Sequence, residues 1–416
     1  MITRVLAADL PRHVGRPVKI AGWVHRRREL KSVTFVVVRD RSGLAQVVLA
    51  EPVALPEETV VEVRATVTAN AQAPGGVELT EAVFTALSEP AKPPPFDLYR
   101  PTVPASLPTI LDHAPVALRH PWLKAPFAVA AASVAGFRRA LDGLGFVETH
   151  TPKIVGSATE SGANVFGIDY FGRPAYLAQS PQFFKQALVG VFERVCEVGP
   201  VFRAEPHDTS RHLAQYTSLD AELGFITDHR DVMAVLREAI AGMMDSVAEH
   251  APAELSLLEA VLPEVPAEIP EIHFSEVTAK DDLTPADERE LSRWASREHG
   301  SDFLFVTGYP MAKRPFYTHP DPARPAYSNS FDLLFRGVEL VTGGQRLHRY
   351  EDYLAALAAR GENPAAYEDY LDVFAHGMPP HGGFAIGLER WTARLLDVAN
   401  VRQVTLFPRD LHRLTP

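Results

Sequence analysis

Arginines and a carboxylate in the segment VFRAEPHDTSRHLAQYTSLDAE could bind an anionic ligand. Arg203 and Glu205 are two residues apart, so a strand would place both side chains on one face. A polar loop follows, and Arg211 and His212 begin the return of the chain. Two arginines that converge on one sheet face form a clamp for an anion, and Tyr216 could offer its ring to a base. The alternative is an ordinary hairpin with surface ion pairs.

A second segment, SFDLLFRGVELVTGGQRLHR, has the residue types of a metal site. Asp332 and Glu339 are seven residues apart, so one straight strand would put them on opposite faces, whereas a turn at 336–337 would let them converge. Two carboxylates near phosphates suit Mg²⁺, which relies on substrate oxygens for its other ligands. Gly343–Gly344 would let a ligand approach the backbone, and Arg346 would project into the same site. The alternative is a strand pair with solvated carboxylates.

A third segment, GGFAIGLERWTARLL, predicts a glycine-rich strand that runs into a helix carrying Glu389 and Arg390. It lacks the spacing and the βαβ setting of a dinucleotide-binding loop. An arginine in the first turn of such a helix can point at a nucleotide. By itself this motif has low specificity.

These segments need a large domain to position them, and the apolar patterns indicate one from residue 122 onward. Strand-like stretches there alternate with expected helices near 182–192, 230–249, 284–299, 350–360 and 364–376. Strands joined by hairpins, with helices between them, predict an α+β domain around an antiparallel sheet. The stretch 251–272, rich in proline and glutamate, is expected to be a surface insertion.

The first 90 residues have a different pattern. Five stretches rich in Val, Thr and Phe lie within 17–88, several of them alternating apolar and polar residues, with turn signals at 41–43 and 74–76. Five short strands predict a small closed barrel of the OB-fold type, which commonly binds single-stranded nucleic acid. The proline-rich stretch 91–121 is predicted to be a linker. The expected parts are therefore 1–90, 91–121 and 122–416.

Charge is unevenly distributed along the chain. The whole protein has a formal net charge of −11, yet residues 1–50 contain ten Lys and Arg against three Asp and Glu, which gives +7 there and −18 elsewhere. Three of these arginines stand in the block GWVHRRREL (22–30). The pattern suggests a polyanion partner at this end, and the alternative is a solvated basic face.

Cysteine usage and hydropathy exclude several classes of protein and of metal site. The single cysteine, Cys196, excludes an intrachain disulfide framework and a cysteine-based zinc site. The first residues lack a secretory h-region, and no apolar run is long enough to span a bilayer. We expect a cytoplasmic protein without a membrane partner.

In this order, the segments resemble class II aminoacyl-tRNA synthetases. GFVETHTPKI is similar to motif 1, with Pro152 at its proline, where the family builds a homodimer interface; FRAE followed by RHL resembles motif 2; GLER resembles motif 3. TESGANVFGIDYF, YLAQSPQFFKQ and FDLLFRGVELVTGGQRLHRY are similar to aspartyl-tRNA synthetases in their compact archaeal-type form. The resemblance covers essentially the whole chain, apart from the variable stretch near 251–300.

The resemblance implies roles for individual residues. Aspartate would be bound by Glu160, Ser180, Gln182, Lys185, Arg203, Thr342 and Arg346. ATP would be bound by Arg203, Glu205, Arg211, His212, Leu213, Tyr216, Glu339, Gly387, Leu388, Glu389 and Arg390. Mg²⁺ would be held by Glu339, Asp332 and Thr342, the last standing where relatives often have Ser. The tRNA anticodon would meet Arg26, Phe35 and Gln46.

The chemistry agrees with these roles. Attack of an aspartate carboxylate on the α-phosphate of ATP needs two anions held in line and their charge neutralised, so it needs no protein nucleophile. A cationic pocket of Arg346 and Lys185 would favour aspartate over asparagine. The predicted function is an aspartate–tRNA ligase that uses ATP and Mg²⁺.

The choice of tRNA rests on two residues. In archaeal-type relatives, a tryptophan and a lysine at the positions of His25 and Pro74 accompany acceptance of tRNA(Asp) only. With His and Pro there, this chain is expected to accept tRNA(Asn) as well, and an amidotransferase would then convert the product. The alternatives are neutral variation at both positions in an enzyme for tRNA(Asp) only, an inactive nucleic-acid-binding paralogue, and a paralogue that makes a free amino acid such as asparagine.

Without the resemblance, Phe35 would be interpreted as barrel core, because it alternates with Val33 and Val37.

Overall fold

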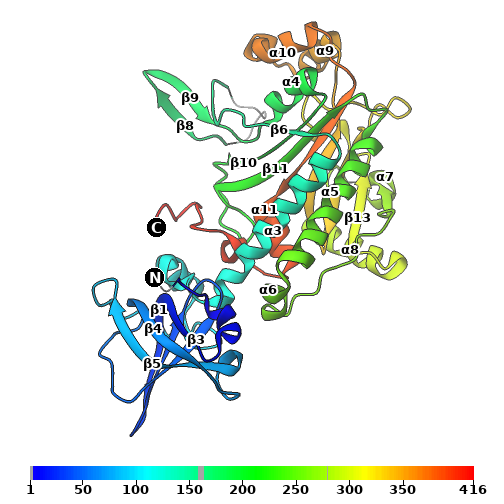
Figure 1. Cartoon of the computed structure of the whole chain (residues 1–416). Helices are drawn as coiled ribbons and strands as arrows, with labels where there is room; N and C mark the ends of the chain where they lie inside the picture. Colours follow the sequence, from blue (N-terminus) through cyan, green and yellow to red (C-terminus); the bar gives the residue numbers. More distant parts are fainter. Residues whose placement is uncertain (1–2, 158–163, 279) are drawn as a thin grey trace. The chain divides into compact units, whose positions relative to one another are not determined.

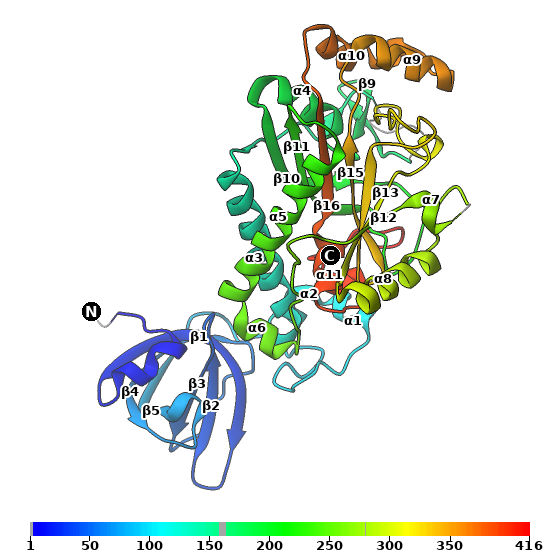
Figure 2. The same ribbon diagram turned by 90° about the vertical axis from the view of Figure 1, so that its right-hand side faces the viewer.

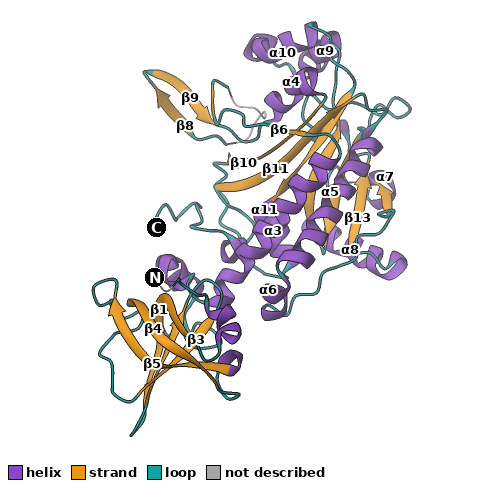
Figure 3. Cartoon of the chain, viewed as in Figure 1, coloured by secondary structure: helices purple, strands orange, loops and turns teal. Residues whose placement is uncertain are grey.

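The computed structural model describes residues 3–157, 164–278 and 280–416. It contains two compact units, Met1–Leu123 and Lys124–Pro416, which are described separately here. Figure 3 shows that the first is built mainly of strands and that the second combines a large sheet with helices. In the part of the chain that the structure describes, no helix is long and apolar enough to cross a membrane.

The first unit contains a closed five-stranded barrel, as predicted, with the strand order β1-β2-β3-β5-β4. Alternating valines fill its interior, for example Val36 and Val38, and the short 3-10 helix Ala7–His13 adds Leu10 to the same core. This alternation is what fixes which face of each strand points inward. The strands are β1 (Pro17–Glu29), β2 (Thr34–Arg39), β3 (Leu44–Leu49), β4 (Val60–Ala69) and β5 (Val77–Ala86).

The proline-rich stretch after the barrel is more ordered than a simple linker. Two short helices, α1 (Leu107–Asp112) and α2 (Ala114–Ala117), form within it. The Ser106 side chain caps α1 by accepting a hydrogen bond from the backbone N–H of Thr109. Phe96, Leu98 and Ala117 make a small core of their own. Sequence periodicity missed these helices because each spans fewer than two turns.

The second unit is organised around an eight-stranded sheet, seen face-on in Figure 2. Its strand pairs are antiparallel, except the outermost pairs β12–β13 and β10–β6, which are parallel. The predicted α+β class is therefore confirmed. In spatial order the strands are β12 (Glu271–His273), β13 (Phe303–Thr307), β14 (Ser330–Phe335), β15 (Val338–Gln345), β16 (His381–Gly387), β11 (Gln215–Gly224), β10 (Arg194–Phe202) and β6 (Val147–Glu148).

Two long helices, α3 (Pro121–Gly143) and α5 (His229–His250), run side by side over one face of the sheet (Figure 1). They approach closely at Gly136, where an added Cβ would lie 2.3 Å from the carbonyl oxygen of Gly242. The main core lies on this face of the sheet and is aromatic, with Phe331 and Trp391 fully buried.

The remaining elements surround the sheet. Residues 251–272 are less peripheral than expected, because Leu255 and Ile269 pack against the main core. The other helices are α4 (Gln182–Phe192), α6 (Pro252–Leu257), α7 (Phe274–Val277), α8 (Pro285–His299), α9 (Tyr350–Arg360), α10 (Glu368–Ala375) and α11 (Leu388–Leu395). A separate small sheet has the order β7 (Ile154–Val155), β9 (Arg173–Leu177) and β8 (Gly167–Tyr170).

Candidate active site

A cavity of about 370 Å³ opens in the second unit, on the sheet face opposite α3 and α5. Strand alternation produces it: Ser218 and Asp220 of β11 line the cavity, whereas Leu219 and Ala221 between and beside them enter the core. The predicted residues that line it are Ser180, Gln182, Lys185, Arg203, Glu205, Arg211, His212, Leu213, Tyr216, Glu339, Thr342, Arg346, Gly387, Glu389 and Arg390.

Three predicted residues are not among the lining residues. Leu388 packs against the main core instead. Asp332 is 3% exposed and contacts the cavity through Arg314 rather than directly. Glu160 lies outside the described residues.

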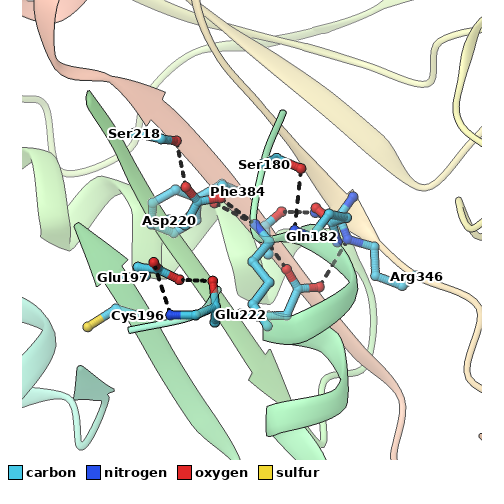
Figure 4. A network of polar contacts seen from close by, with 12 residues as sticks. Ser180, Gln182, Cys196, Glu197, Ser218, Asp220, Glu222, Arg346 and Phe384 are labelled. Atoms are coloured by element: carbon cyan, nitrogen blue, oxygen red, sulfur yellow. Dashed lines mark hydrogen bonds and ion pairs between the residues drawn. The ribbon is translucent and has the colours of Figure 1, made fainter. Parts of the chain in front are cut away.

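The two predicted aspartate-binding cations are buried, and each is paired with a carboxylate. Figure 4 shows Arg346 beside Glu222. The Nε of Arg346 donates to Glu222 at 3.0 Å, and its Nη2 donates to the carbonyl oxygen of Gly383 at 3.0 Å. The Nζ of Lys185 donates to Asp220 at 3.0 Å and lies 3.3 Å from Glu222. These contacts hold both cationic groups in fixed positions.

The pairing corrects the prediction of a simply cationic pocket, because two carboxylates balance the two cations. Burial alone would raise the pKa of Glu222, but Arg346 and Lys185 hold that pKa below its usual value. The strand β16 makes room for this carboxylate with a glycine. An added Cβ at Gly383 would lie 2.0 Å from the Oε2 of Glu222. Selectivity must therefore come from geometry as well as from charge.

Two glutamine side chains in this cavity leave buried amide groups for a ligand. Both amide atoms of Gln179 and the Nε2 of Gln182 are buried and have no hydrogen-bond partner among the described residues. The backbone N–H of Gln182 is held by the hydroxyl of Ser180 at 3.3 Å. Buried polar groups in folded proteins are normally satisfied, so these amides indicate where a polar ligand binds.

Arg203 and Glu205 of the first sequence segment lie in a loop. Strand β10 ends at Phe202, so Arg203 and Glu205 follow the strand instead of sharing its face as expected. They still face each other, with Nη1 and Oε1 3.8 Å apart. The Arg203 guanidinium lies 5.8 Å from the ring centroid of Tyr216, and His212 lies 3.8 Å from Glu205.

Besides Asp220 and Glu222, the sequence analysis missed the charged residues Glu288 and Arg314 of the cavity region. Glu288 of α8 lies 3.8 Å from Arg211 and accepts the backbone N–H of Glu339 at 3.2 Å. It was missed because it belongs to the stretch treated as variable. Arg314 donates to Asp332 at 2.9 Å and lies 4.0 Å from the ring centroid of Tyr309. The only available signal for Arg314 was a basic residue beside the aromatic pair of MAKRPFY.

The two predicted metal-binding carboxylates converge as expected. The chain turns at Arg336 and Gly337, which have φ of 45° and 81°, and a bulge between Leu333 and Leu334 shifts the register. That shift brings Glu339 to the face of Asp332. Burial raises the pKa of Glu339 to about 7, and the charge of Asp332 adds to the effect.

These residues fit Mg²⁺. Two nearby carboxylates, Asp332 and the Glu339 whose pKa is raised, attract a cation, and the hydroxyl of Thr342 lies 3.3 Å from Glu339. Mg²⁺ commonly takes one or two protein carboxylates and fills its shell with phosphate oxygens and water. Accordingly, the described residues contain no group of three or more His, Cys, Asp or Glu that could hold a metal by themselves.

The third sequence segment forms the expected strand and helix, β16 and α11. Arg390 donates to the carbonyl oxygen of Glu339 at 3.0 Å, so it belongs to the carboxylate end of the cavity. Glu389 has a structural contact, because its carboxylate accepts the backbone N–H of Thr217 at 3.0 and 3.1 Å. Gly343 lines the cavity and also allows close packing, since an added Cβ would lie 2.4 Å from the ring of Phe331.

In the first unit, the predicted anticodon-contact residues share one outer barrel face. Arg26 pairs in register with Val37, which pairs with Gln46 on the next strand, and Phe35 is two residues from Val37. Phe35 is half-buried and outside the core, so the barrel-core interpretation of this residue is wrong. Arg26 lies 4.4 Å from the ring centroid of Tyr99.

His25 occupies a different position. It lies at a β-bulge of β1, is 7% exposed, and its Nδ1 is 3.0 Å from the Nη1 of Arg39. Arg39 forms a bidentate pair with Glu58 at 2.8 and 2.9 Å, and Arg119 joins this carboxylate at 2.9 Å. His25 can therefore influence a bound tRNA only through these partners. Pro74 is exposed and begins the 3-10 turn Pro74–Gly76.

We expect the stability of the barrel to fall in mild acid because of His25. Burial lowers the pKa of this imidazole to about 4, and Arg39 lowers it further. The unfolded chain takes up the proton near pH 6.5, so stability is full above that pH and is lost as the pH falls toward 4. Between pH 7 and pH 5, His25 should account for about 2 kcal/mol of lost unfolding free energy. His25→Phe should remove most of this dependence.

The measurement is hydrogen exchange of the barrel amides in the full chain at both pH values. His376→Phe, at an exposed position of the second unit, is the matched control and should keep the wild-type pH dependence. A pH dependence that is the same in His25→Phe and in the wild type would contradict the assignment.

Comparison with known proteins agrees with this geometry. Residues 106–411 match the family model of class II tRNA synthetases (D, K and N), and residues 18–83 match the OB-fold nucleic acid binding domain. The chain therefore belongs to the class II tRNA synthetases of the D, K and N group.

Several relatives match this chain over nearly its full length. The aspartate–tRNA(Asp/Asn) ligase of Thermus thermophilus is 47% identical, covering 99% of this chain and 100% of its own. That of Deinococcus radiodurans is 47% identical, covering 100% and 99%. The aspartate–tRNA(Asp) ligase of Pyrococcus furiosus is 38% identical, covering 97% of each chain.

Solved structures of similar shape come from the same group. The asparaginyl-tRNA synthetase of Pyrococcus horikoshii, complexed with asparaginyl-adenylate, superposes with a TM-score of 0.92 at 30% identity, covering 100% of both chains. A putative aspartyl-tRNA synthetase from Leishmania major gives a TM-score of 0.91 at 28% identity, covering 100% of this chain and 95% of that one.

Proposed function

We propose that this protein is a cytoplasmic aspartate–tRNA ligase that activates L-aspartate with ATP and transfers it to the 3′ end of tRNA(Asp) and tRNA(Asn). The observation that carries the proposal is the fixed Arg346 guanidinium beside unsatisfied buried amides, in a cavity that also contains Arg203 and Arg390. The names of the two relatives that are 47% identical support the choice of amino acid and of both tRNAs.

Arg346 would select the side-chain carboxylate of aspartate. Its described hydrogen bonds use Nε and Nη2 for Glu222 and Gly383, which leaves Nη1 for a ligand. A guanidinium has only donors, so it matches a carboxylate oxygen, whereas the NH₂ group of asparagine would meet it donor to donor. Gln179 and Gln182 would bind the remaining polar groups of the amino acid.

The reaction would then proceed by direct displacement. An oxygen of the aspartate α-carboxylate attacks the α-phosphorus of ATP, a new P–O bond forms, and the bond to pyrophosphate breaks. Arg203, Arg211 and Arg390 would hold the phosphates and neutralise the charge that develops on them. Mg²⁺, bound by Glu339 with Asp332 and Thr342, would supply further charge neutralisation. The 3′ hydroxyl group of the tRNA would then take the aspartyl group and release AMP.

We also propose a homodimer and a downstream amidotransferase. The homodimer is supported by large apolar residues that are exposed in the segment that resembles motif 1, Val147 and Ile154. Charging of tRNA(Asn) would require an amidotransferase downstream, because the product carries aspartate. The burial of His25 means that relaxed tRNA choice would act through Arg39 and the position of β1, with exposed Pro74 acting separately.

Amino-acid-dependent ATP–pyrophosphate exchange tests the activation step. We expect exchange with L-aspartate and Mg²⁺, and at most a trace with asparagine or lysine. Exchange that depends on asparagine or lysine instead would overturn the amino acid assignment. Folded protein without exchange for any of the three would overturn the enzyme assignment.

Replacing Phe35 with alanine should weaken tRNA use without affecting activation. A base stacked on an aromatic ring contributes about 1–3 kcal/mol, so the KM for tRNA should rise by about tenfold to a hundredfold. Aspartate-dependent pyrophosphate exchange should stay at the wild-type level. The control is Val83→Ala, which removes an exposed apolar side chain from β5 of the same barrel. An unchanged KM in Phe35→Ala would contradict the stacking role.

A further inference from the structure

A second cleft, of about 490 Å³, shares a wall with the active-site cavity of the larger unit. We call it the histidine cleft. Three adjacent residue pairs form the wall, and one member of each pair faces each side. Thr318, Ser330 and Arg346 line the active-site cavity, whereas His319, Asn329 and Gln345 line the histidine cleft.

The backbone of this wall is continuous and hydrogen-bonded. The N–H of His319 donates to the carbonyl oxygen of Gln345 at 3.0 Å, and the N–H of Asn329 donates to that of His319 at 2.9 Å. The N–H of Gln345 closes the set by donating to Asn329 at 2.8 Å. The histidine cleft is therefore a built feature of the sheet edge and not a gap between loose loops.

The histidine cleft contains buried imidazole nitrogens that lack partners. His229, the first residue of α5, is only 6% exposed, and neither ring nitrogen has a hydrogen-bond partner among the described residues. The Nδ1 of His348 is also buried and has no hydrogen-bond partner among the described residues. Leaving a buried donor or acceptor unsatisfied costs about 1–3 kcal/mol for each group. Several such atoms in one cleft indicate a ligand that satisfies them.

The charges at the cleft cancel in pairs. Arg230 lies 3.1 Å from Asp228, and Arg324 lies 3.3 Å from Asp321. Burial lowers the pKa of His229 to about 4, so its imidazole is uncharged at neutral pH. Burial also lowers the pKa values of His273 and His348. An ion would thus find no unbalanced charge here, and the described residues offer no group of three or more potential metal ligands.

The shape of the hydrogen-bonding groups then defines the ligand. A neutral imidazole presents one donor and one acceptor on different sides of its ring, so a ligand can meet one of these nitrogens with a group that both donates and accepts. His319 and His348 add two nearly parallel rings, at 12° with centroids 6.5 Å apart, and Asn329 and Gln345 add amides. We propose that the histidine cleft binds an uncharged, planar amide-type group, as found in a carboxamide or a nucleobase, and that His229 is its main hydrogen-bonding partner.

The test uses the full-length protein labelled with ¹⁵N at histidine, titrated at pH 7 with nicotinamide and, separately, with uridine. The signals of His212, which lines the active-site cavity, are followed in the same spectra, so that binding there is distinguished from binding in the histidine cleft. His229→Phe keeps a planar ring but removes both nitrogens, so it identifies the His229 signals and should weaken binding by about tenfold. His229→Asn keeps a donor and an acceptor and should retain binding within about threefold. His376→Phe, exposed and outside the cleft, is the matched control.

We expect at least one probe to shift the ring nitrogen signals of His229. Binding of nicotinamide alone would identify a carboxamide ligand, and binding of uridine alone would identify a nucleobase. The proposal is overturned if neither probe binds, or if His229→Phe binds as tightly as the wild type. It is also overturned if His376→Phe loses as much affinity as His229→Phe. None of these results bears on aspartate-dependent exchange, which tests the proposed function separately.

Discussion

Replacing Arg346 with alanine will abolish aspartate activation. The change removes the group proposed to bind the substrate carboxylate and leaves Glu222 buried with one partner fewer. Truncating one member of a buried, hydrogen-bonded charge pair costs about 2–5 kcal/mol, so aspartate-dependent exchange should fall about a thousandfold. The measurement is kcat/KM for aspartate in ATP–pyrophosphate exchange.

Loss of the fold must be separated from loss of the substrate contact. Arg346→Ala should also destabilise the second unit by about 3–5 kcal/mol, because a buried charge loses its partner. The double variant Arg346→Ala/Glu222→Gln neutralises that carboxylate and should regain much of the stability without regaining exchange. Arg293→Ala, which removes an exposed arginine from α8, should behave like the wild type. Exchange restored in the double variant would contradict the substrate-binding role of Arg346.

Replacing Arg203 with alanine will have the second large effect. Arg203 follows β10 and lies beside Tyr216 and Glu205. In the proposed reaction its guanidinium neutralises charge at the phosphates. Removing one preorganised donor to a transition-state anion lowers the rate about a hundredfold to a thousandfold. We expect kcat for exchange to fall by that factor, with the unfolding free energy changed by about 1 kcal/mol or less because the side chain is partly exposed.

Lysine at this position offers an informative comparison. Arg203→Lys keeps the positive charge but loses the planar fork, so it should recover only part of the rate. Full recovery would mean that charge alone is sufficient, and no loss in Arg203→Ala would remove Arg203 from the phosphate site.

Local patterns were sufficient for the barrel and for several of the longer helices. Alternating apolar residues predicted the barrel, and helical spacing predicted α4, α8 and α9 to within one residue of their ends. The turn at Arg336 and Gly337 was also foreseen, since two carboxylates seven residues apart could converge only across a hairpin. These features depend on residues that are close in sequence, where periodicity is informative.

The failures have a common physical cause. Pairing of Lys185 with Asp220 and of Arg346 with Glu222 depends on elements far apart in the chain, so no local pattern could reveal that the cations are already neutralised. The same holds for Glu288, whose role depends on α8 packing near β15. His25 was predicted to affect the choice of tRNA, but a bulge in β1 turns its side chain inward toward Arg39 of β2.

Charging of purified tRNA(Asp) and tRNA(Asn) transcripts with labelled aspartate tests the central claim most directly. Both transcripts should accept aspartate, and neither should accept asparagine. Charging of tRNA(Asp) alone would contradict the dual specificity proposed for His25 and Pro74. If folded protein charges neither transcript with aspartate, the aspartate–tRNA ligase assignment itself is wrong.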